Sequence, residues 1–483
     1  METLPREALE PASPAASACS DWFSQLDAAL DRAGVRDASA YRIPGFPYLR
    51  VDRFLASFRN ELKPNEPAFN AWAGHLARLD AEARGYELKN LPQRAFPILG
   101  VNDKESASTE TQTCAARLAR EDLASAAKRN LLIGRAAVPD DYADWKRVLG
   151  IYPLTRVPFL KGIEAWQDET VELFKKARIA LAPEHAIAKY RPASPAHSAD
   201  RVAMLFAHLK KDALGIPELD AKDRETLFEA YAPEYEIETT GRDDHFGPLS
   251  WNGNPSPEVG VTGPVAYTRL ALTRYHGQNL VQLVYTIWFP QRPANRTFDM
   301  LSGKLDGVVF RVTLGSDGAP LIYDSIHACG CYHLFFPTAR MQLLPAPDPR
   351  IEWAFVPVAL PAMQPAQRVV VRIAGRTHYV VDVQAQAAAN GAARYRLADD
   401  DELRAMPLAA GVTRSAFGPD GIVPGTERGE RLFYWPMGID SPGAMRQWGR
   451  HATAFVGRRH FDDAHLIEER FAPAAGTQAG FEK

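Results

Sequence analysis

The chain has 483 residues, of which 46% are hydrophobic and 24% are charged, and its formal net charge is -3. This composition is typical of a folded soluble protein, and the length corresponds to about two to four domains. The charge balance argues against a nucleic-acid partner, because such proteins usually carry a basic face. No stretch reaches the roughly 18 consecutive apolar residues of a membrane span, so we also expect no transmembrane segment.

Residues 1–19 are rich in Pro, Ala and Ser and predict a disordered leader. Charged residues occupy the place where a signal peptide would have its apolar core, namely Glu2, Arg6, Glu7 and Glu10. The sequence therefore leaves the compartment open. It would be the bacterial envelope or periplasm if an export signal is missing from this sequence, and the cytoplasm otherwise.

Residues 20–235 predict a mainly helical region. Its first helix has apolar residues at helical spacing from Trp22 to Leu30, with Ser20 or Asp21 as the N-cap and Gly34 as the end. Apolar spacing and stop signals predict further helices near residues 66–84, 115–129, 162–177, 198–214 and 221–231.

After residue 235 the hydrophobic period changes from that of a helix to that of a strand. Alternating segments joined by short turns predict strands over 267–276, 280–289 and 308–314, from 321 onward, and over 369–373 and 379–383. We expect an α+β protein in which residues 236–400 form an antiparallel meander, as a sandwich or a partly closed barrel. Residues 401–483, rich in Gly, Pro and charge, are expected to wrap this β domain irregularly.

The segment from His327 to His333 has the densest chemistry in the chain. In a continuous strand, alternate side chains share a face, which would place His327, Cys329, Cys331 and His333 together. A rise of about 3.3 Å per residue puts the two cysteines about 6.6 Å apart and the two histidines about 20 Å apart. The cysteines could therefore ligate one metal with one adjacent histidine, and the remaining ligands would come from elsewhere, such as His276 or His378.

Three functions are compatible with this segment. The leading prediction is a metal-binding protein, with a metalloenzyme as its catalytic form, using Cys329, Cys331, His327 and His333 as ligands of zinc, iron or copper. The alternative is a non-catalytic envelope protein that binds a small molecule or an envelope component and has structural, buried or disulfide-bonded cysteines. The third is an enzyme with a cysteine nucleophile of lowered pKa.

Other candidate catalytic residues lie outside this segment. His460 with Asp463 would form an oriented imidazole if residues 458–465 are looped, and a solvated charged segment is the alternative. His245 lies at the junction of the helical and β regions, where an ordinary polar turn is the alternative. The acids nearest the His/Cys segment, as possible proton carriers or solvated turn residues, are Asp299, Asp306 and Asp324.

The four cysteines permit two disulfides, and their spacing indicates Cys19–Cys114 as the long-range pair. So few cysteines fit a cytosolic protein with free thiols equally well. The common nucleotide-binding and hydrolase motifs are missing: no P-loop, Rossmann glycine pattern, His-Glu-x-x-His or Gly-x-Ser-x-Gly occurs.

Two resemblances extend these patterns. Ser325 to His333 resembles the Ser-His-Gly-Cys strand of the L,D-transpeptidases, in a different register and without an Arg after the Cys. Passages at 41–50, 138–142, 327–333 and 457–463 resemble a family of uncharacterised bacterial proteins, many exported or lipid-anchored, with no known activity. The second resemblance implies an envelope location and draws attention to Cys19, as a lipidation site or as a disulfide partner of Cys114.

Overall fold

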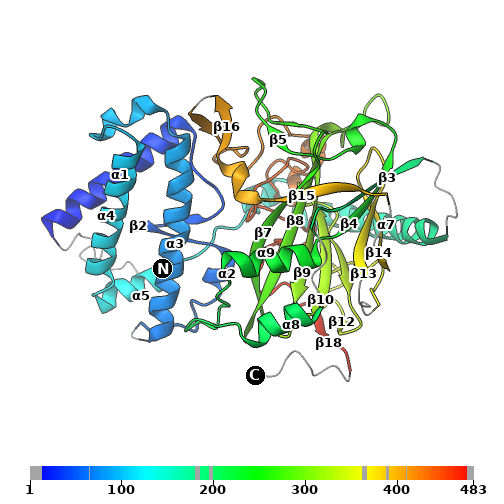
Figure 1. Cartoon of the computed structure of the whole chain (residues 1–483), viewed down its shortest axis with the longest axis horizontal. Coiled ribbons are helices and arrows are strands. Elements are labelled where there is room, and N and C mark those ends of the chain that lie inside the picture. Colours follow the sequence, from blue (N-terminus) through cyan, green and yellow to red (C-terminus); the bar gives the residue numbers. More distant parts are fainter. Residues whose placement is uncertain are drawn as a thin grey trace.

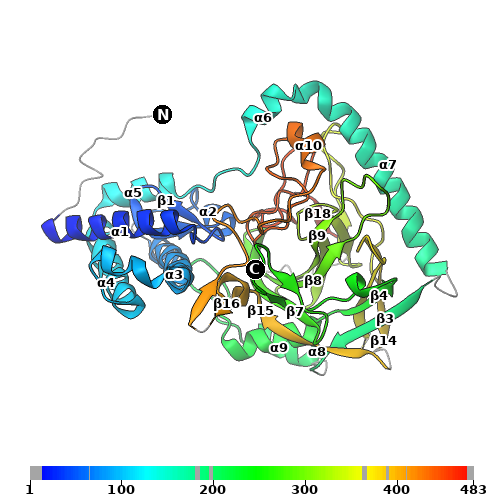
Figure 2. The same cartoon turned by 90° about the horizontal axis from the view of Figure 1, so that it is seen from above.

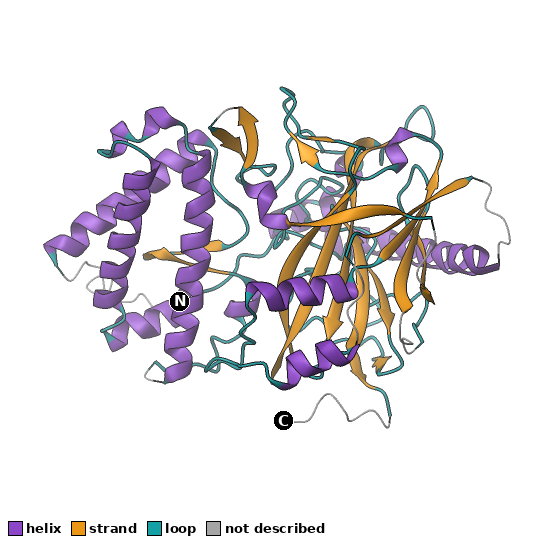
Figure 3. Ribbon diagram, in the orientation of Figure 1, coloured by secondary structure: helices purple, strands orange, loops and turns teal. Residues whose placement is uncertain are grey.

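The computed structural model describes residues 13–64, 66–179, 185–194, 199–361, 367–387, 391–409 and 411–475. A helical N-terminal part lies beside a large curved sheet, and the C-terminal segment packs on that sheet (Figure 1). Helices dominate the first part of the chain and strands the second (Figure 3), which confirms the predicted α+β class.

The N-terminal part surrounds its own apolar core, which includes Phe23, Trp72 and Leu76. A short hairpin lies among its helices and was not predicted. Its elements are α1 (Pro14–Ala33), β1 (Tyr41–Ile43), β2 (Phe46–Val51), α2 (Arg53–Ala56), α3 (Pro67–Asn90), α4 (Lys104–Asp122) and α5 (Ala126–Arg135).

Helix α1 begins earlier than predicted and ends where predicted. The side chain of Ser13 caps it by accepting a hydrogen bond from the backbone N–H of Ala16, and Pro14 occupies the first turn, where its missing N–H costs nothing. The predicted cap at Ser20 or Asp21 was therefore wrong, and residues 13–19 are not a disordered leader; residues 1–12 lie outside the described part of the chain. Gly34 ends the helix with φ 66°, a left-handed conformation that glycine adopts at low cost.

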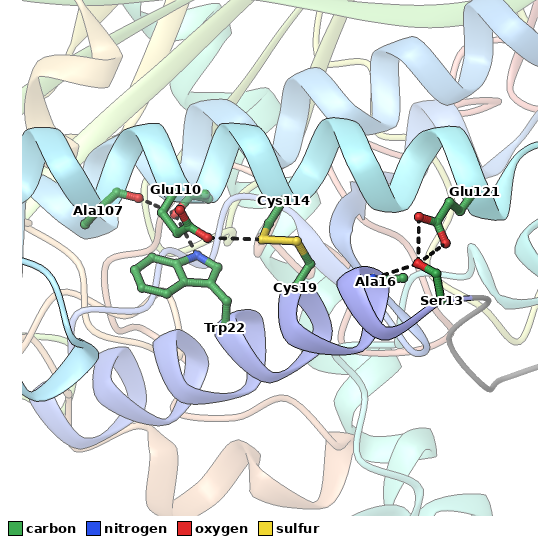
Figure 4. Close-up of a disulfide and its surroundings, with 9 residues drawn as sticks. Ser13, Ala16, Cys19, Trp22, Ala107, Glu110, Cys114 and Glu121 are labelled. Carbon is green, nitrogen blue, oxygen red and sulfur yellow. Dashed lines mark hydrogen bonds between the residues drawn. A yellow bond between two sulfur atoms is a disulfide. The ribbon is translucent and has the colours of Figure 1, made fainter.

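The predicted Cys19–Cys114 disulfide is present and joins α1 to α4 (Figure 4). Two hydrogen bonds flank it on the same pair of helices. Trp22 Nε1 donates to Thr111 Oγ1 over 3.2 Å, and the Ser13 hydroxyl donates to the Glu121 carboxylate. The disulfide therefore fixes the packing of the first helix on the fourth.

We expect Cys19→Ser/Cys114→Ser to lower the free energy of unfolding by about 2 to 5 kcal/mol, because the bond closes a long loop in the unfolded chain. The two cysteines are 95 residues apart in sequence. Urea denaturation of the oxidised wild type and the double variant measures the difference. The wild type under reductant should match the variant; a loss below about 1 kcal/mol would contradict the assigned role.

A ten-stranded sheet forms the centre of the molecule, in the order β11-β10-β9-β8-β7-β15-β3-β4-β13-β14. Its strands are β3 (Ala186–Pro192), β4 (Glu234–Thr239), β7 (Val265–Tyr275), β8 (Gln278–Arg292), β9 (Gly303–Leu314), β10 (Pro320–His327), β11 (Leu334–Pro337), β13 (Gln367–Ile373), β14 (Val380–Ala387) and β15 (Ala393–Asp399). Strands β7 to β11 pair antiparallel in sequence order, as predicted for a meander.

The other half of the sheet is mixed, which the meander prediction missed. Strand β15 pairs parallel with both β7 and β3, and β13 pairs parallel with β4. Strands β3 and β4 come from the region predicted to be mainly helical. Their partners lie far away in sequence, so local hydrophobic period could not indicate these pairings.

The sheet curves until its edge strands come close, and α7 (Tyr152–Ile179) lies along this seam (Figure 2). From α7, Trp166 packs on Tyr332 and Phe355, and Phe174 packs on Phe336 of β11. The apolar interior includes Tyr285, Phe310 and other inward-facing strand residues. Other helices after residue 135 are α6 (Asp144–Leu149), α8 (Ala199–Ala207), α9 (Ala221–Tyr231) and α10 (Arg431–Tyr434).

The C-terminal segment wraps the outer face of strands β7 to β10, as predicted. Met445 and Phe461 from this segment share an apolar cluster with Trp288 and Ile326 of the sheet. The remaining short strands are β5 (Leu249–Ser250), β6 (Glu258–Val259), β12 (Met341–Leu343), β16 (Met406–Ala409), β17 (Val412–Arg414) and β18 (Phe471–Pro473). Among the helices of the described ranges, none has the length and apolar character needed to cross a membrane.

Candidate thiol site

The His/Cys segment is a tight turn between two strands. Strand β10 ends at His327 and β11 begins at Leu334. The backbone N–H of Gly330 donates to His327 O over 2.7 Å, and that of His327 donates to Cys331 O over 2.9 Å. The prediction that the four side chains alternate on one strand face was therefore wrong.

Two residues with positive φ reverse the chain here: Gly330 at 94° and Tyr332 at 60°. A Cβ atom at Gly330 would lie 2.6 Å from the carbonyl oxygen of Ala452 in the C-terminal segment. Only glycine fits this position, because both the backbone conformation and the close approach exclude a side chain. The C-terminal segment thus holds the turn in place from outside.

The two predicted histidine ligands bond to separate carboxylates. His327 Nδ1 lies 3.3 Å from Asp306 Oδ1, and His333 Nε2 lies 2.9 Å from Asp324 Oδ2. Burial lowers the pKa of both imidazoles, that of His333 to about 3, so both are neutral near pH 7. Asp306 thus orients His327, and Asp324 orients His333.

No group of three or more His, Cys, Asp or Glu side chains in the described ranges is arranged to hold a metal ion. The two distal histidines considered as further ligands have acidic neighbours instead. His276 Nδ1 lies 3.6 Å from Glu468 Oε1, and His378 Nδ1 lies 3.0 Å from Asp306 Oδ2. The predicted four-ligand site is therefore not assembled in this conformation.

The two thiols interact directly with each other. Both cysteines are free and buried, and a hydrogen bond from the Cys331 thiol to the Cys329 sulfur lowers the pKa of Cys329. The same bond and burial raise the pKa of Cys331 well above its ordinary value. The pair therefore loses its first proton more readily than an isolated thiol and resists losing the second. The Arg428 guanidinium also favours a thiolate at Cys329.

Cys331 opens into a pocket of about 470 Å³ between α7, the turn and the C-terminal segment. Its apolar wall includes Phe159, Ile163 and Trp166 of α7, together with Tyr434 and Phe455. Cys331, His333, Glu352 and Glu430 add polar groups to the same wall. An apolar pocket with a few convergent polar groups is the usual form of a small-molecule site.

Glu430 is the titratable acid of this pocket. Burial raises its pKa to about 7, although Arg428 and Arg292 act in the opposite direction. Its charge acts on both thiols and raises their pKa when it is ionised. A carboxyl group with a pKa near neutrality can both donate and accept a proton under ordinary conditions. Nothing in the sequence around Glu430 distinguished it from other charged residues of the C-terminal segment.

The buried carboxylate of Asp306 contacts three basic side chains near the His/Cys turn. In addition to His327 and His378, its carboxylate lies 3.3 Å from Arg428 Nη2. Burial opposes ionisation of Asp306, but Arg428 and His327 hold its pKa well below the usual range. Burial would lower the pKa of His378, whereas the carboxylates of Asp244 and Asp306 raise it. Asp306 thus fixes His327 and the arginine that faces Cys329.

His460, Asp463 and His245 do not line the thiol pocket. His460 and Asp463 lie close together, as the looped alternative predicted, with 3.4 Å between His460 Nδ1 and Asp463 Oδ1. His460 Nε2 lies 3.5 Å from Asp140 Oδ1, in a charged network that links residues before α6 to the C-terminal segment. His245 Nδ1 lies 2.6 Å from the Tyr190 hydroxyl. Catalytic roles for these residues stay predictions.

We expect the free energy of unfolding to fall between about pH 6.5 and about pH 9 because of His460. Burial opposes its protonation, but Asp140 and Asp463 raise its pKa from 6.5 to about 9. The stabilisation is complete below pH 6.5 and is lost as the pH rises through 9, and it amounts to about 3 kcal/mol. Urea titrations of the wild type and His460→Gln test this: their difference should shrink as the pH rises, and a constant difference would contradict it.

Comparison with known proteins identified no relationship. No protein-family model, no curated protein and no solved structure matches the chain. The resemblances noted in the sequence therefore stay predictions.

Proposed function

We propose that the protein is a cysteine-dependent enzyme that acts on an apolar or aromatic substrate. The observation that supports this most directly is the meeting of two groups in one pocket: the Cys331 thiol of a proton-sharing pair, and the Glu430 carboxyl with a pKa of about 7. A thiol nucleophile and a titratable carboxyl group that line one pocket are the basic arrangement of covalent catalysis with a general base.

The arrangement suits acyl transfer. Cys331 Sγ attacks the substrate carbonyl carbon as its thiol proton leaves. Glu430 accepts the thiol proton and returns it to the leaving atom as the bond between that atom and the acyl carbon breaks. Water then attacks the thioester carbon while Glu430 accepts a water proton. The carbon–sulfur bond breaks, the acid leaves, and Glu430 returns the proton to Cys331 Sγ. His333 is too weak a base to take part as a proton acceptor, since its pKa is about 3.

The walls of the pocket indicate the substrate class. Trp166, Phe159 and Phe455 present aromatic surface, and Arg428, whose charge acts on both thiols, is already paired with Asp306. A pocket of about 470 Å³ accommodates a small molecule with an aryl or short acyl group. We therefore expect little affinity for strongly anionic substrates.

Acyl-enzyme trapping tests this proposal. With a p-nitrophenyl ester of a phenylalkanoic acid, we expect one acyl group per chain, found by tandem mass spectrometry on the peptide that contains Cys331. Cys331→Ser should remove the adduct and reduce p-nitrophenol release by at least about 100-fold. The matched control is Ser256→Ala. It alters a small, buried polar side chain that does not line the pocket, so it should change neither the adduct nor p-nitrophenol release. An adduct on surface residues alone would contradict the proposal.

Metal binding by Cys329 and Cys331 is a second candidate, and the contact between the two thiols favours it. Two adjacent thiolates suit zinc, copper or iron, with further ligands supplied by the pocket after rearrangement or by a bound molecule. Elemental analysis by mass spectrometry, on protein purified without chelator, distinguishes the candidates. Near-stoichiometric metal that is lost in Cys329→Ser/Cys331→Ser would favour the metal protein, whereas metal-free protein that still forms the acyl adduct would favour the thiol enzyme.

A further inference from the structure

An exposed apolar surface lies beside residues that line the thiol pocket, namely Pro158, Phe159 and Tyr434. We call it the apolar rim, and it comprises Val148 and Leu149 of α6, Ile151 in the link to α7, Leu154 of α7, and Leu432 and Phe433 of α10. Val148 is 75% exposed, Leu432 is 70% exposed and Phe433 is 57% exposed. Large exposed aliphatic side chains on neighbouring elements mark a surface that binds something apolar.

The elements of the apolar rim are firmly placed, so its exposure is a feature of the fold. The backbone N–H of Ala143, just before α6, donates to Gly438 O over 2.8 Å, and Phe159 packs edge-on against Tyr434 at 5.4 Å between ring centroids. Arg147 points inward, where its Nε donates to Met437 O over 2.8 Å. Figure 2 shows α6, α10 and the start of α7 close together at one end of the molecule.

Positive charge flanks the apolar rim along α6 and the start of α7, although the chain as a whole carries a net charge of -3. Between residues 144 and 161 the only acid is Asp144, whereas the cations are Lys146, Arg147, Arg156 and Lys161. Lys146 pairs with Asp440. Arg156, Lys161 and the neighbouring Arg431 make no ion pair with any residue in the described ranges. The charges of Lys161 and Arg431 are therefore available to an anionic partner, and Arg156 also acts on the Asp348 carboxylate.

The combination fits the interface of an anionic membrane. Aliphatic side chains with an exposed tryptophan, Trp145, enter the boundary between headgroups and acyl chains, and flanking Lys and Arg contact anionic headgroups. The apolar rim also continues along α7 into the pocket wall, which begins at Pro158 and Phe159. We propose that the apolar rim docks the protein on an anionic lipid surface, with the pocket entrance facing the lipid. This docking is independent of the thiol chemistry.

Co-sedimentation of the full chain with large vesicles tests the proposal. We expect binding to vesicles of equimolar phosphatidylglycerol and phosphatidylcholine, and at least about tenfold weaker binding to phosphatidylcholine alone or in high salt. Val148→Ser/Leu149→Ser and Arg156→Gln/Lys161→Gln should each reduce the affinity at least about tenfold. Met204→Ser, an exposed apolar residue on α8, is the matched control and should bind as the wild type does.

The proposal is overturned if the wild type does not bind anionic vesicles, or if the apolar-rim variants bind them as tightly as the wild type does. It is also overturned if no vesicle binding occurs and the wild type is a dimer that becomes a monomer in Val148→Ser/Leu149→Ser. The last would assign the surface to a second copy of the chain. Because Val148, Leu149 and Lys161 are exposed and Arg156 is partly exposed, the variants should unfold at the same urea concentration as the wild type. Cys331→Ser should bind vesicles normally, so a failed docking test and a failed enzyme test are distinguishable.

Discussion

Replacing Asp306 by asparagine is expected to lower the free energy of unfolding by about 3 to 5 kcal/mol. The carboxylate is fully buried and faces Arg428, His327 and His378. Asparagine fits the same space but leaves the buried Arg428 guanidinium without its counter-charge, and this uncompensated charge dominates the cost. Urea denaturation of both proteins near neutral pH measures the effect.

The same substitution at an exposed ion pair is the control. Asp31 lies 3.8 Å from Arg36 at the end of α1, and its side chain is half exposed. Asp31→Asn should leave the free energy of unfolding nearly unchanged, since solvent screens such pairs. The effect of Asp306→Asn should also shrink in acid. The lowered pKa of Asp306 stabilises the fold above pH 3.8, and this stabilisation is lost as the pH falls towards the folded-state pKa. A loss below about 1 kcal/mol near pH 7 would contradict the central position of Asp306.

Glu430→Gln is expected to change two rates in opposite directions. Alkylation by iodoacetamide needs only a thiolate, and removing the Glu430 charge lowers the pKa of both thiols, so the Cys331 alkylation rate at pH 8 should rise about threefold or more. Acyl transfer also needs the proton carrier, so p-nitrophenol release should fall about 100-fold or more. In the wild type this release should rise with pH through about 7, the pKa of Glu430.

The matched control is Glu427→Gln, which removes a nearby exposed carboxyl group outside the pocket. Neither rate should change by more than about twofold in this variant, because solvent screens an exposed charge. If Glu430→Gln slowed alkylation and acyl transfer equally, the substitution would have disturbed the pocket, and Glu430 would not be the proton carrier. If it left both rates unchanged, Glu430 would have no part in the chemistry.

The spacing of apolar residues, together with capping and turn residues, predicted most of the helices and strands. The helix expected over 221–231 has those bounds in the structure, because Asp220 and Asp223 form a capping box at its start. Alternation and turn residues identified the β7–β8 and β13–β14 hairpins within a few residues. The start of α1 was misplaced because a Pro/Ala/Ser composition indicated disorder, whereas Ser13 and Pro14 were initiation signals.

The sequence drew attention to the segment that forms the candidate site but did not predict its geometry. The sequence singled out Cys329, Cys331 and their flanking histidines, together with Asp306 and Asp324. It could not show that Gly330 and Tyr332 reverse the chain, because the reversal depends on packing against Ala452 from the distant C-terminal segment. Glu430 was missed for a similar reason: its raised pKa comes from tertiary burial, which leaves no local signal.

The most direct test of the account is the alkylation of the native protein at pH 7 by a limited amount of iodoacetamide, followed by intact-mass and peptide mass spectrometry. Because Cys19 and Cys114 form a disulfide, only Cys329 and Cys331 can react. We predict one alkyl group per chain, on Cys331 in the pocket, added while the protein is still folded. Thiols that stay unmodified until the protein unfolds would show that the pair is inert core, and would contradict a thiol active site.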